Sequence, residues 1–213
     1  MIEQITENLY LIRKMPFQER AYIVTLLSSE DQVIKAVYRP GVKKTGSLQP
    51  FQKFSAQIKI SKQNSLSKMS NIQSIQAYHM QGYALFAGLY LNELIEKILI
   101  AGPPTSGIFH LYDQAISLLS KKPLAIVLRW FELTFLEKLG YGIDVSYPET
   151  YGIACIDEQW QISSKSSAFT IGDVKNALRQ SLDIKQAKRL PELTVPMLSS
   201  LMPDKTIHVL SLF

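Results

Sequence analysis

Hydrophobic and polar residues alternate along the first third of the chain. Between residues 32 and 39, Ile34, Ala36 and Tyr38 alternate with Lys35 and Arg39. Successive side chains of a strand point to opposite faces, so this pattern predicts a strand with both cations on one face. Strand-like composition recurs in residues 8–15, 20–29 and 51–61, and residues 71–78 form either a fifth strand or the approach to a helix. Four or five short antiparallel strands favour a small barrel, in which closure removes the exposed edges.

From residue 78 onward, apolar residues recur at helical spacing instead. Residues 78–100 are apolar on more than one face, which is typical of a central helix packed from two sides. A second helix is predicted from Pro123 to Gly140, because proline suits a first turn and glycine suits a helix end. Thr170 with Asp173 three residues later predicts another helix start. Further helices are predicted at 107–121 and, interrupted by Pro191 and Pro196, at 183–202, with a small hairpin around Trp160.

These patterns predict an α+β protein with a β-barrel domain over residues 1–77 and an all-helical domain over residues 78–213. The two domains differ in charge: the first has eleven Lys/Arg against five Asp/Glu, and the second has twelve against thirteen. No acid occurs between Asp31 and Glu93, although eight lysines and arginines do. A surface of one sign attracts polyanions, so the barrel is expected to bind nucleic acid, with a merely solubilising surface as the alternative.

The candidate nucleic-acid-binding residues are the cations of the first domain. We expect a phosphate track made of Arg20, Lys35, Arg39, Lys43, Lys44, Lys53, Lys59 and Lys62. Nearby rings could stack on bases, namely Tyr22, Tyr38, Phe51 and Phe54. Phe54 shares a face with apolar neighbours and is therefore expected in the core, and Phe51 is expected to be buried rather than stacked. Phosphate contacts do not read the sugar, so DNA and RNA both stay open, as does an adaptor that binds an acidic protein.

Residues with catalytic or metal-binding chemistry are sparse. The single cysteine, Cys155, excludes an internal disulfide and a cysteine-rich zinc site. The three histidines, His79, His110 and His208, form no metal-ligand motif. The sequence contains neither a phosphate-binding glycine loop nor a glycine-flanked serine elbow. We therefore expect no cofactor, no metal and no enzymatic activity.

The ends and apolar runs of the chain bear on its location. The first fifteen residues are too polar for a signal peptide, and the longest apolar runs are far shorter than the roughly 20 residues that a membrane span needs. The expectation is a soluble protein of the cytoplasm.

Several stretches together resemble the bacterial recombination mediator family RecO. Residues 38–54 look like the family's basic barrel loop, which precedes a Leu-Gln-Pro-Phe element. Residues 90–99 and 108–119 resemble its paired central helices. The best match is residues 128–142, with an Arg-x-Phe-Glu start and a Leu-Gly-Tyr end. The order and spacing of these stretches carry the resemblance, rather than any single motif.

The resemblance implies an N-terminal OB-type barrel and a C-terminal helical domain. It also implies binding of single- and double-stranded DNA, annealing of complementary strands, and loading of RecA onto strands coated by single-stranded-DNA-binding protein. RecR would be the partner in this RecF pathway, and the location would be the nucleoid of a bacterium. Many relatives carry a four-cysteine zinc site after the Leu-Gly-Tyr helix, where this chain has only Cys155, so zinc is not expected.

The resemblance further suggests that the helical domain binds the acidic, apolar tail of single-stranded-DNA-binding protein. Such a tail requires an apolar groove with one or two cations at its edge. The expected contacts are Lys121, Lys122, Arg129 and Trp130; the alternative is that Trp130 lies in the core and Arg129 pairs with Glu132 or Glu93.

A C-terminal basic cluster could also reach DNA. It consists of Lys175, Arg179, Lys185, Lys188 and Arg189. Three acids among these cations, Asp173, Asp183 and Glu192, favour an ordinary solvated surface and leave its contact with DNA open.

Overall fold

The structure is a computed structural model that describes residues 2–40, 48–60, 66–100, 105–165, 167–204 and 206–208, without the side chains of residues 2–7 and 60. It divides into two compact units. The first consists of Met1–Met80 and Gly102–Phe109, and the second of Gln81–Ala101 and His110–Phe213. The expected domain boundary lies between residues 77 and 78. In the structure the first continuous part of unit 1 ends at Met80, and a second segment of that unit ends at Phe109.

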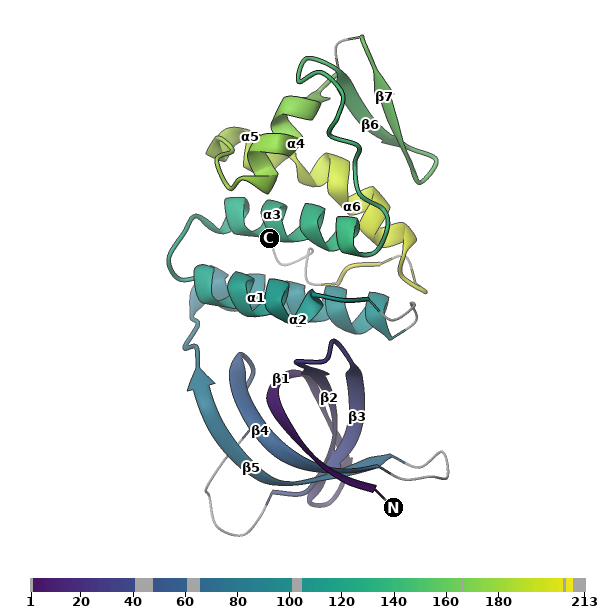
Figure 1. Cartoon of the computed structure of the whole chain (residues 1–213). Helices are drawn as coiled ribbons and strands as arrows, with labels where there is room; N and C mark the ends of the chain where they lie inside the picture. The colour runs from purple at the N-terminus through teal and green to yellow at the C-terminus, as the bar shows by residue number, and fades with distance from the viewer. Residues whose placement is uncertain are drawn as a thin grey trace. The chain divides into compact units, whose positions relative to one another are not determined.

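Five strands of the first unit form a closed barrel (Figure 1). They are β1 (Ile2–Gln18), β2 (Ala21–Ser28), β3 (Val33–Tyr38), β4 (Gln52–Ile60) and β5 (Ser67–Ala77). The order around the ring is β1-β2-β3-β5-β4, in which β3 and β5 run parallel and all other neighbours run antiparallel. This is the five-stranded arrangement of the OB fold, and the predicted barrel is confirmed.

Strand β1 begins earlier than the sequence pattern predicts. Its first part pairs with β4 from Ile2 to Tyr10, and the segment from Leu9 to Gln18 pairs with β2. Register shifts interrupt both ladders, so a simple alternation of polar and apolar residues does not extend through the whole strand. The uncertain segment 71–78 is a strand rather than a helix start, because β5 continues to Ala77.

Alternate side chains of the strands fill the barrel. Leu9, Val24, Leu26 and Phe54 are fully buried, and they share one cluster with other apolar side chains of all five strands. Ala36 and Tyr38 of β3 belong to this cluster too. The burial predicted for Phe54 and the two faces predicted for β3 are therefore confirmed, and Tyr38, offered as a stacking ring, lies in the core.

A carboxylate of the β2–β3 turn binds a helix start within the first unit. Asp31 adopts a left-handed backbone conformation with a φ of 60°. Its two carboxylate oxygens accept hydrogen bonds from the backbone N–H groups of Gly107, at 2.6 Å, and Phe109, at 2.7 Å. These donors precede or begin α2 (Ile108–Leu118), where a helix leaves its first N–H groups unpaired.

The remaining helices belong to the second unit. They are α1 (Gly82–Leu94) with its π-helical continuation η1 (Ile95–Leu99), α3 (Leu124–Lys138), α4 (Ile171–Leu178), α5 (Ile184–Arg189) and α6 (Pro191–Ser200). Pro123 is the N-cap of α3, and Gly140 just beyond its end has a φ of 87°, a left-handed conformation that favours glycine. Pro191 occupies the first turn of α6 and separates it from α5, as predicted, whereas the interruption predicted at Pro196 is wrong, because Pro196 lies inside α6. None of the helices in the described ranges is long and apolar enough to cross a membrane.

The second unit also contains a small sheet, so the prediction of an all-helical domain is corrected here. Its strands are β6 (Gly152–Ile156), β7 (Gln159–Ser163) and β8 (Phe169–Thr170), in the order β7-β6-β8. The predicted hairpin around Trp160 is confirmed, and its two-residue turn places Asp157 and Glu158 at positive φ, as tight hairpins require. The capping box of Thr170 and Asp173 is confirmed at the start of α4.

Candidate nucleic-acid interface

The outer face of β3 carries two of the predicted cations. Lys35 and Arg39 are exposed, and Val37 lies between them on the same face. Arg39 Nη2 donates a hydrogen bond to the uncharged Oε1 of Gln18 at 3.2 Å, and Arg39 forms no ion pair with the side chains that the structure describes. Lys35 has no ion pair among the side chains that the structure describes.

Cations of the neighbouring strands extend this face. Val37 of β3 is the backbone partner of Lys68 on β5, and Lys68 is in turn opposite Lys59 on β4. In the other direction Lys35 pairs with Thr25, which pairs with Arg13 on β1. A direct cross-strand partner points to the same face of the sheet, so these side chains form one contiguous surface around Val37. We call this surface the barrel row and define it by Arg13, Lys35, Arg39, Lys59 and Lys68.

The β1–β2 turn, at the same end of the barrel, carries one acid and one cation, Glu19 and Arg20. Arg20 lies in this turn and is exposed. Lys14 places its Nζ 4.5 Å from the ring centroid of Tyr22, whose ring stacks on that of Tyr38 with centroids 6.4 Å apart. In OB folds the β1–β2 loop and the face of strands β2 and β3 are the usual ligand-binding region.

Three of the four candidate stacking rings are buried. Phe54 is fully buried and Phe51 is 3% exposed, as predicted for both. Tyr38 is 6% exposed, and burial raises the pKa of its hydroxyl above the ordinary value. Tyr22 is half-buried and packs against the barrel core. Tyr22 is therefore the one of these four rings that keeps appreciable contact with solvent.

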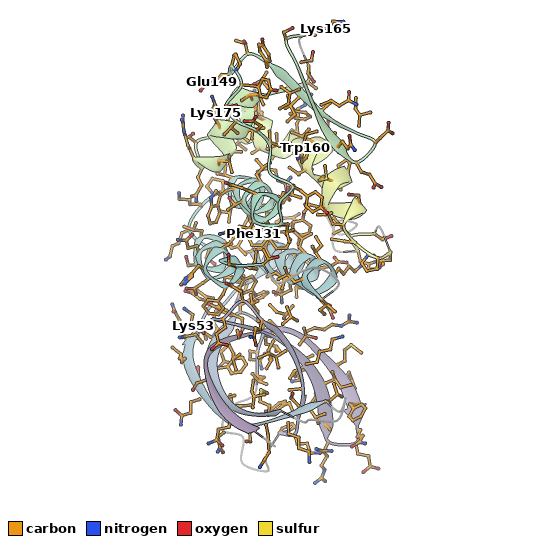
Figure 2. The ribbon with its side chains drawn as sticks, turned by 45° about the vertical axis from the view of Figure 1, so that its right-hand side comes forward. Lys53, Phe131, Glu149, Trp160, Lys165 and Lys175 are labelled. Carbon is orange, nitrogen blue, oxygen red and sulfur yellow. The ribbon has the colours of Figure 1, made fainter. Side chains whose placement is uncertain are left out.

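Lys53 lies apart from the barrel row. Six residues separate it from Lys59 along β4, a distance of about 20 Å in a strand. Its Nζ lies 5.7 Å and 5.8 Å from the ring centroids of Tyr10 and Phe109. Figure 2 shows Lys53 at one end of the barrel. The predicted residues Lys43, Lys44 and Lys62 lie outside the described residues.

Sequence reasoning thus found part of the surface and missed part of it. Lys35, Arg39 and Lys59 are brought together, Arg20 lies at the same end, and Lys53 does not join them. Arg13 and Lys68 of the barrel row were not among the predicted residues, although Lys68 is in the acid-free window. The missing signal was the parallel pairing of β3 with β5, because a ladder between strands distant in sequence leaves no local pattern.

Arg129, the central cation of the predicted partner contact in the second unit, is buried and not available to a partner. Arg129 is 4% exposed and forms a short ion pair with the fully buried Glu132. The alternative of an internal Arg129–Glu132 pair is thus what the structure contains. Lys121 and Lys122 are exposed, and Trp130 is half-buried.

Glu132 is the centre of a buried polar network that joins three helices. Its carboxylate accepts hydrogen bonds from Tyr90 of α1, at 2.8 Å, and from Thr194 of α6, in addition to Arg129. Burial, followed by the neighbouring Glu132 charge, raises the pKa of Tyr90 well above its ordinary value. Arg129 Nε finds no acceptor among the described residues. The network serves to hold α1, α3 and α6 together, because all but this one N–H are satisfied internally.

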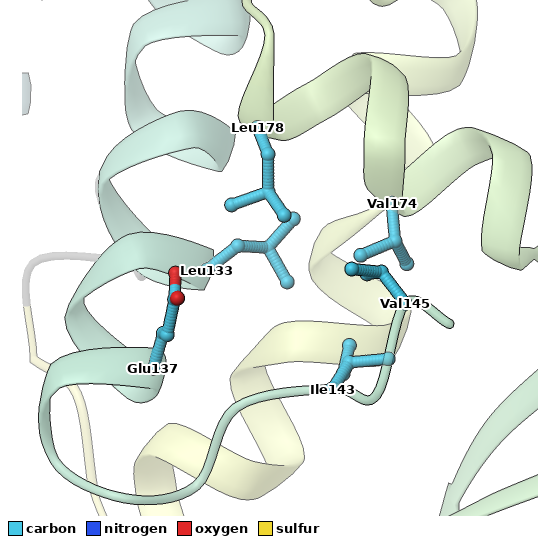
Figure 3. Close-up of a pocket in the computed structure, with 6 residues that line it drawn as sticks. All are labelled: Leu133, Glu137, Ile143, Val145, Val174 and Leu178. Atoms are coloured by element: carbon cyan, nitrogen blue, oxygen red, sulfur yellow. The ribbon is translucent and has the colours of Figure 1, made fainter. Parts of the chain in front are cut away.

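A small apolar pocket lies beside α3 (Figure 3). Five apolar side chains line it together with one carboxylate, that of Glu137; the apolar residues are Leu133, Ile143, Val145, Val174 and Leu178. The Glu137 carboxylate repels an acidic ligand, so this pocket does not suit an acidic peptide tail. Within the described ranges, no three His, Cys, Asp or Glu side chains gather as metal ligands do.

Comparison with known sequences assigns both parts of the chain. The family model "Recombination protein O N terminal" matches residues 1–78, and "Recombination protein O C terminal" matches residues 79–149. A DNA repair protein RecO of Pseudoalteromonas atlantica is 31% identical over 176 residues, which cover 79% of this chain and 72% of that protein. The RecO proteins of Alteromonas mediterranea and Pseudomonas paraeruginosa are 30% and 34% identical, with 66% and 62% of this chain covered.

The chain spans 63% and 57% of the length of the latter two relatives, less than two thirds of each. The matches nevertheless run through the barrel and into the helices of the second unit, in agreement with the OB topology of β1 to β5. The chain belongs to the RecO family of DNA repair and recombination proteins.

Proposed function

We propose that this member of a DNA repair family is a non-enzymatic recombination mediator. It binds single- and double-stranded DNA, anneals complementary strands, and helps to load RecA onto strands coated by single-stranded-DNA-binding protein, with RecR as its partner at the nucleoid. The observation that carries the proposal is the barrel row, in which Lys35, Arg39 and Lys68 surround Val37. A contiguous cationic face on an OB barrel suits a phosphate backbone.

The charges of the barrel row support a polyanionic ligand over a merely solvated surface. Lys59 lies between Lys68 on β5 and Glu3 on β1, so this acid offsets part of the repulsion between the two lysines. Lys35 and Lys68 have no ion pair among the described side chains. A bound phosphate backbone supplies the compensating charge and releases counterions into solution.

Annealing by such a protein needs no catalytic side chain. Two complementary strands repel each other through their phosphates, and a cationic surface lowers that repulsion while raising the local concentration of both strands. The protein's contribution is then the density and placement of positive charge.

The tail of single-stranded-DNA-binding protein is proposed as a further partner of the second unit. Arg129 is buried, and Glu137 makes the pocket beside α3 unfavourable for acids. Trp130 is half-buried and is the part of the predicted contact that we retain. Calorimetry with the tail peptide on Trp130→Ala tests this contact; unchanged affinity would remove Trp130 from the proposal.

Competition between matched DNA and RNA strands tests the central proposal. A labelled DNA strand is bound by the protein, and unlabelled DNA or RNA of equal length and sequence is added in a gel-shift titration. Preference for DNA, together with weaker binding by Lys35→Ala/Arg39→Ala, supports the proposal. Binding of neither nucleic acid would favour the rival adaptor, and preference for RNA would favour an RNA-binding factor.

A further inference from the structure

The positive charges of the second unit are matched unevenly by its acids. Lys175 of α4 pairs with Glu149 at 3.7 Å, and the two side chains lie together in Figure 2. Arg189 of α5 pairs with Glu192 at 3.9 Å and stands over the ring of Phe169. Two members of the C-terminal basic cluster are therefore neutralised within the protein.

The other two acids of this region are occupied by hydrogen-bond donors that carry no charge. Asp173 accepts hydrogen bonds from the backbone N–H of Thr170, at 2.9 Å, and from the side-chain amide of Gln186, at 2.8 Å. Asp183 accepts from the backbone N–H of Lys185 at 2.8 Å, as the N-cap of α5. Both carboxylates thus serve helix starts and form no ion pair with a lysine or arginine among the described residues.

A contact between distant segments gathers the remaining cations. Nζ of Lys122, in the turn before α3, donates a hydrogen bond to Oε1 of Gln180 at 2.6 Å. Gln180 directly follows Arg179, which caps the end of α4. The α2–α3 turn therefore lies beside the connection from α4 to α5, and cations that are far apart in the sequence share one region.

The remaining cations of this region are exposed and, among the described residues, have no ion pair. We call the set the α4–α5 surface; it consists of Lys121, Lys122, Arg179, Lys185 and Lys188. Residues 149–192 contain six acids. Glu149 and Glu192 are paired, and Asp157 and Glu158 form the turn between β6 and β7, which leaves the charges of Asp173 and Asp183 against the five cations of the α4–α5 surface, an excess of three positive charges.

We propose that the α4–α5 surface binds the phosphodiester backbone of a second nucleic-acid strand, while the barrel row holds the first. This inference rests on the proposed DNA binding of the barrel. Several cations without an intervening ion pair suit a ligand with regularly repeated charge. An acidic peptide tail instead requires an apolar groove, and the described pocket next to Leu178 contains the repelling carboxylate of Glu137.

Capture of a second strand is the measurement that separates the two surfaces. The full chain is saturated with one labelled oligo-dT strand, and a second oligo-dT with a different label is titrated in, so that base pairing makes no contribution. Annealing of complementary strands is followed in parallel.

Each lost phosphate contact lowers the affinity of a single strand on the order of fivefold at 0.1 M salt. For Lys122→Ala/Arg179→Ala we expect second-strand capture and the annealing rate to fall roughly 10- to 30-fold, with first-strand affinity within twofold of the unaltered protein.

The matched control removes two charges from the same unit outside this surface. Lys138 lies at the far end of α3, about 22 Å along the helix from its start, and Lys165 follows β7 (Figure 2). Lys138→Ala/Lys165→Ala should capture the second strand like the unaltered protein. Since Lys122→Ala also removes the contact with Gln180, Lys185→Ala/Lys188→Ala is a second test variant that breaks no described side-chain contact, and it should show the same selective loss.

Each other outcome has a distinct meaning. Unchanged second-strand capture in both test variants overturns the inference, and so does an equal fall in first-strand affinity. Loss of tail-peptide binding with normal strand capture also overturns it and assigns the surface to an acidic protein. Failure of the unaltered protein to bind a first strand, or an unchanged first-strand affinity in Lys35→Ala/Arg39→Ala, refutes the proposed function instead.

Discussion

Lys59 of β4 and Lys68 of β5 lie directly opposite each other in an antiparallel ladder of the barrel. Two like charges in this position destabilise the sheet by an amount of the order of the 0.2–1 kcal/mol that favourable cross-strand pairs contribute. Glu3 of β1 is the partner of Lys59 on its other side and offsets part of this repulsion. We propose that an anion bound across β4 and β5 offsets the rest.

Replacement of Lys68 by glutamine should therefore separate stability from binding. We expect Lys68→Gln to raise the free energy of unfolding by a few tenths of a kcal/mol at low salt, because the repulsion from Lys59 is removed. DNA affinity should fall on the order of fivefold at 0.1 M salt. Urea denaturation and fluorescence anisotropy measure the two effects, with Lys165→Gln as the control that changes neither. A loss of both stability and affinity in Lys68→Gln would show that Lys68 affects DNA binding by stabilising the fold.

The salt dependence of DNA binding should report how many phosphates the barrel row neutralises. Each contact to a single strand contributes about 0.7 to the slope of log affinity against log salt. Removal of two cations in Lys35→Ala/Arg39→Ala should flatten that slope by roughly 1.4. The measurement is a set of anisotropy titrations between low and moderate salt. A slope equal to that of the unaltered protein would exclude these two side chains from the contact.

The buried carboxylate of Glu132 should be among the most sensitive positions of the second unit. Glu132→Gln keeps the volume but leaves the Arg129 charge without a compensating anion, which costs about 3–5 kcal/mol in the free energy of unfolding. The same change at Glu137, exposed on the same helix, should cost less than about 0.5 kcal/mol. Urea denaturation of both variants gives the comparison. Similar small losses in both would mean that the Arg129–Glu132 pair contributes little.

Alkaline pH should unfold the protein through two buried tyrosines. Burial raises the pKa of Tyr112, and burial with the nearby Glu132 charge raises that of Tyr90. The folded state keeps both protons when the unfolded state begins to lose them near pH 10, so this stability is complete below pH 10 and decreases above it. The two groups together predict a loss of about 2.7 kcal/mol per pH unit.

The variant Tyr90→Phe/Tyr112→Phe removes both titrating hydroxyls and provides the control for this slope. Its free energy of unfolding should be lower at neutral pH, because the hydrogen bonds to Glu132 and Asn92 are lost, but it should decrease less steeply above pH 10. Denaturant titrations at several pH values between 8 and 11 measure the difference, and equal slopes for both proteins would contradict the assignment.

Asp31 should stabilise the first unit through the two backbone N–H groups that it binds. Asp31→Ala removes both acceptors and also places alanine at a positive φ, so we expect a loss of about 1–2 kcal/mol. Asp31→Asn retains one acceptor oxygen and tolerates the left-handed conformation, and its loss should be smaller. Thermal and urea unfolding rank the three proteins; an asparagine variant as unstable as the alanine variant would point to the charge instead.

Local patterns predicted the parts of the fold whose signal lies within a few residues. The alternation of Ile34, Ala36 and Tyr38 gave the facing of β3 correctly, and Thr170 with Asp173 gave the start of α4. The hairpin around Trp160 could be predicted because a two-residue turn joins its strands. The pairing of this hairpin with β8 could not be inferred from the sequence.

The shape of the candidate site depends on contacts between distant segments. Lys68 joins the barrel row through a parallel ladder with Val37, and Lys53 leaves it because β4 is long enough to reach the other end of the barrel. Arg129 and Trp130 are adjacent in the sequence, yet one is buried against Glu132 and the other is not. Charge composition predicts the kind of ligand, whereas only the packing decides which cations are available to it.

The ring of the barrel is completed by its shortest ladder, in which β3 and β5 are matched only from Ala36 to Tyr38 on one side and from Ser67 to Met69 on the other. Thermal opening of the barrel should start at this ladder between β3 and β5, because so few backbone hydrogen bonds join the two strands. Arg39 follows β3 and Lys68 lies on β5, so a polyanion that contacts both side chains should hold the two strands together. Amide hydrogen exchange in these two segments should consequently slow down when a strand is bound, more than exchange in the longer ladder between β1 and β2.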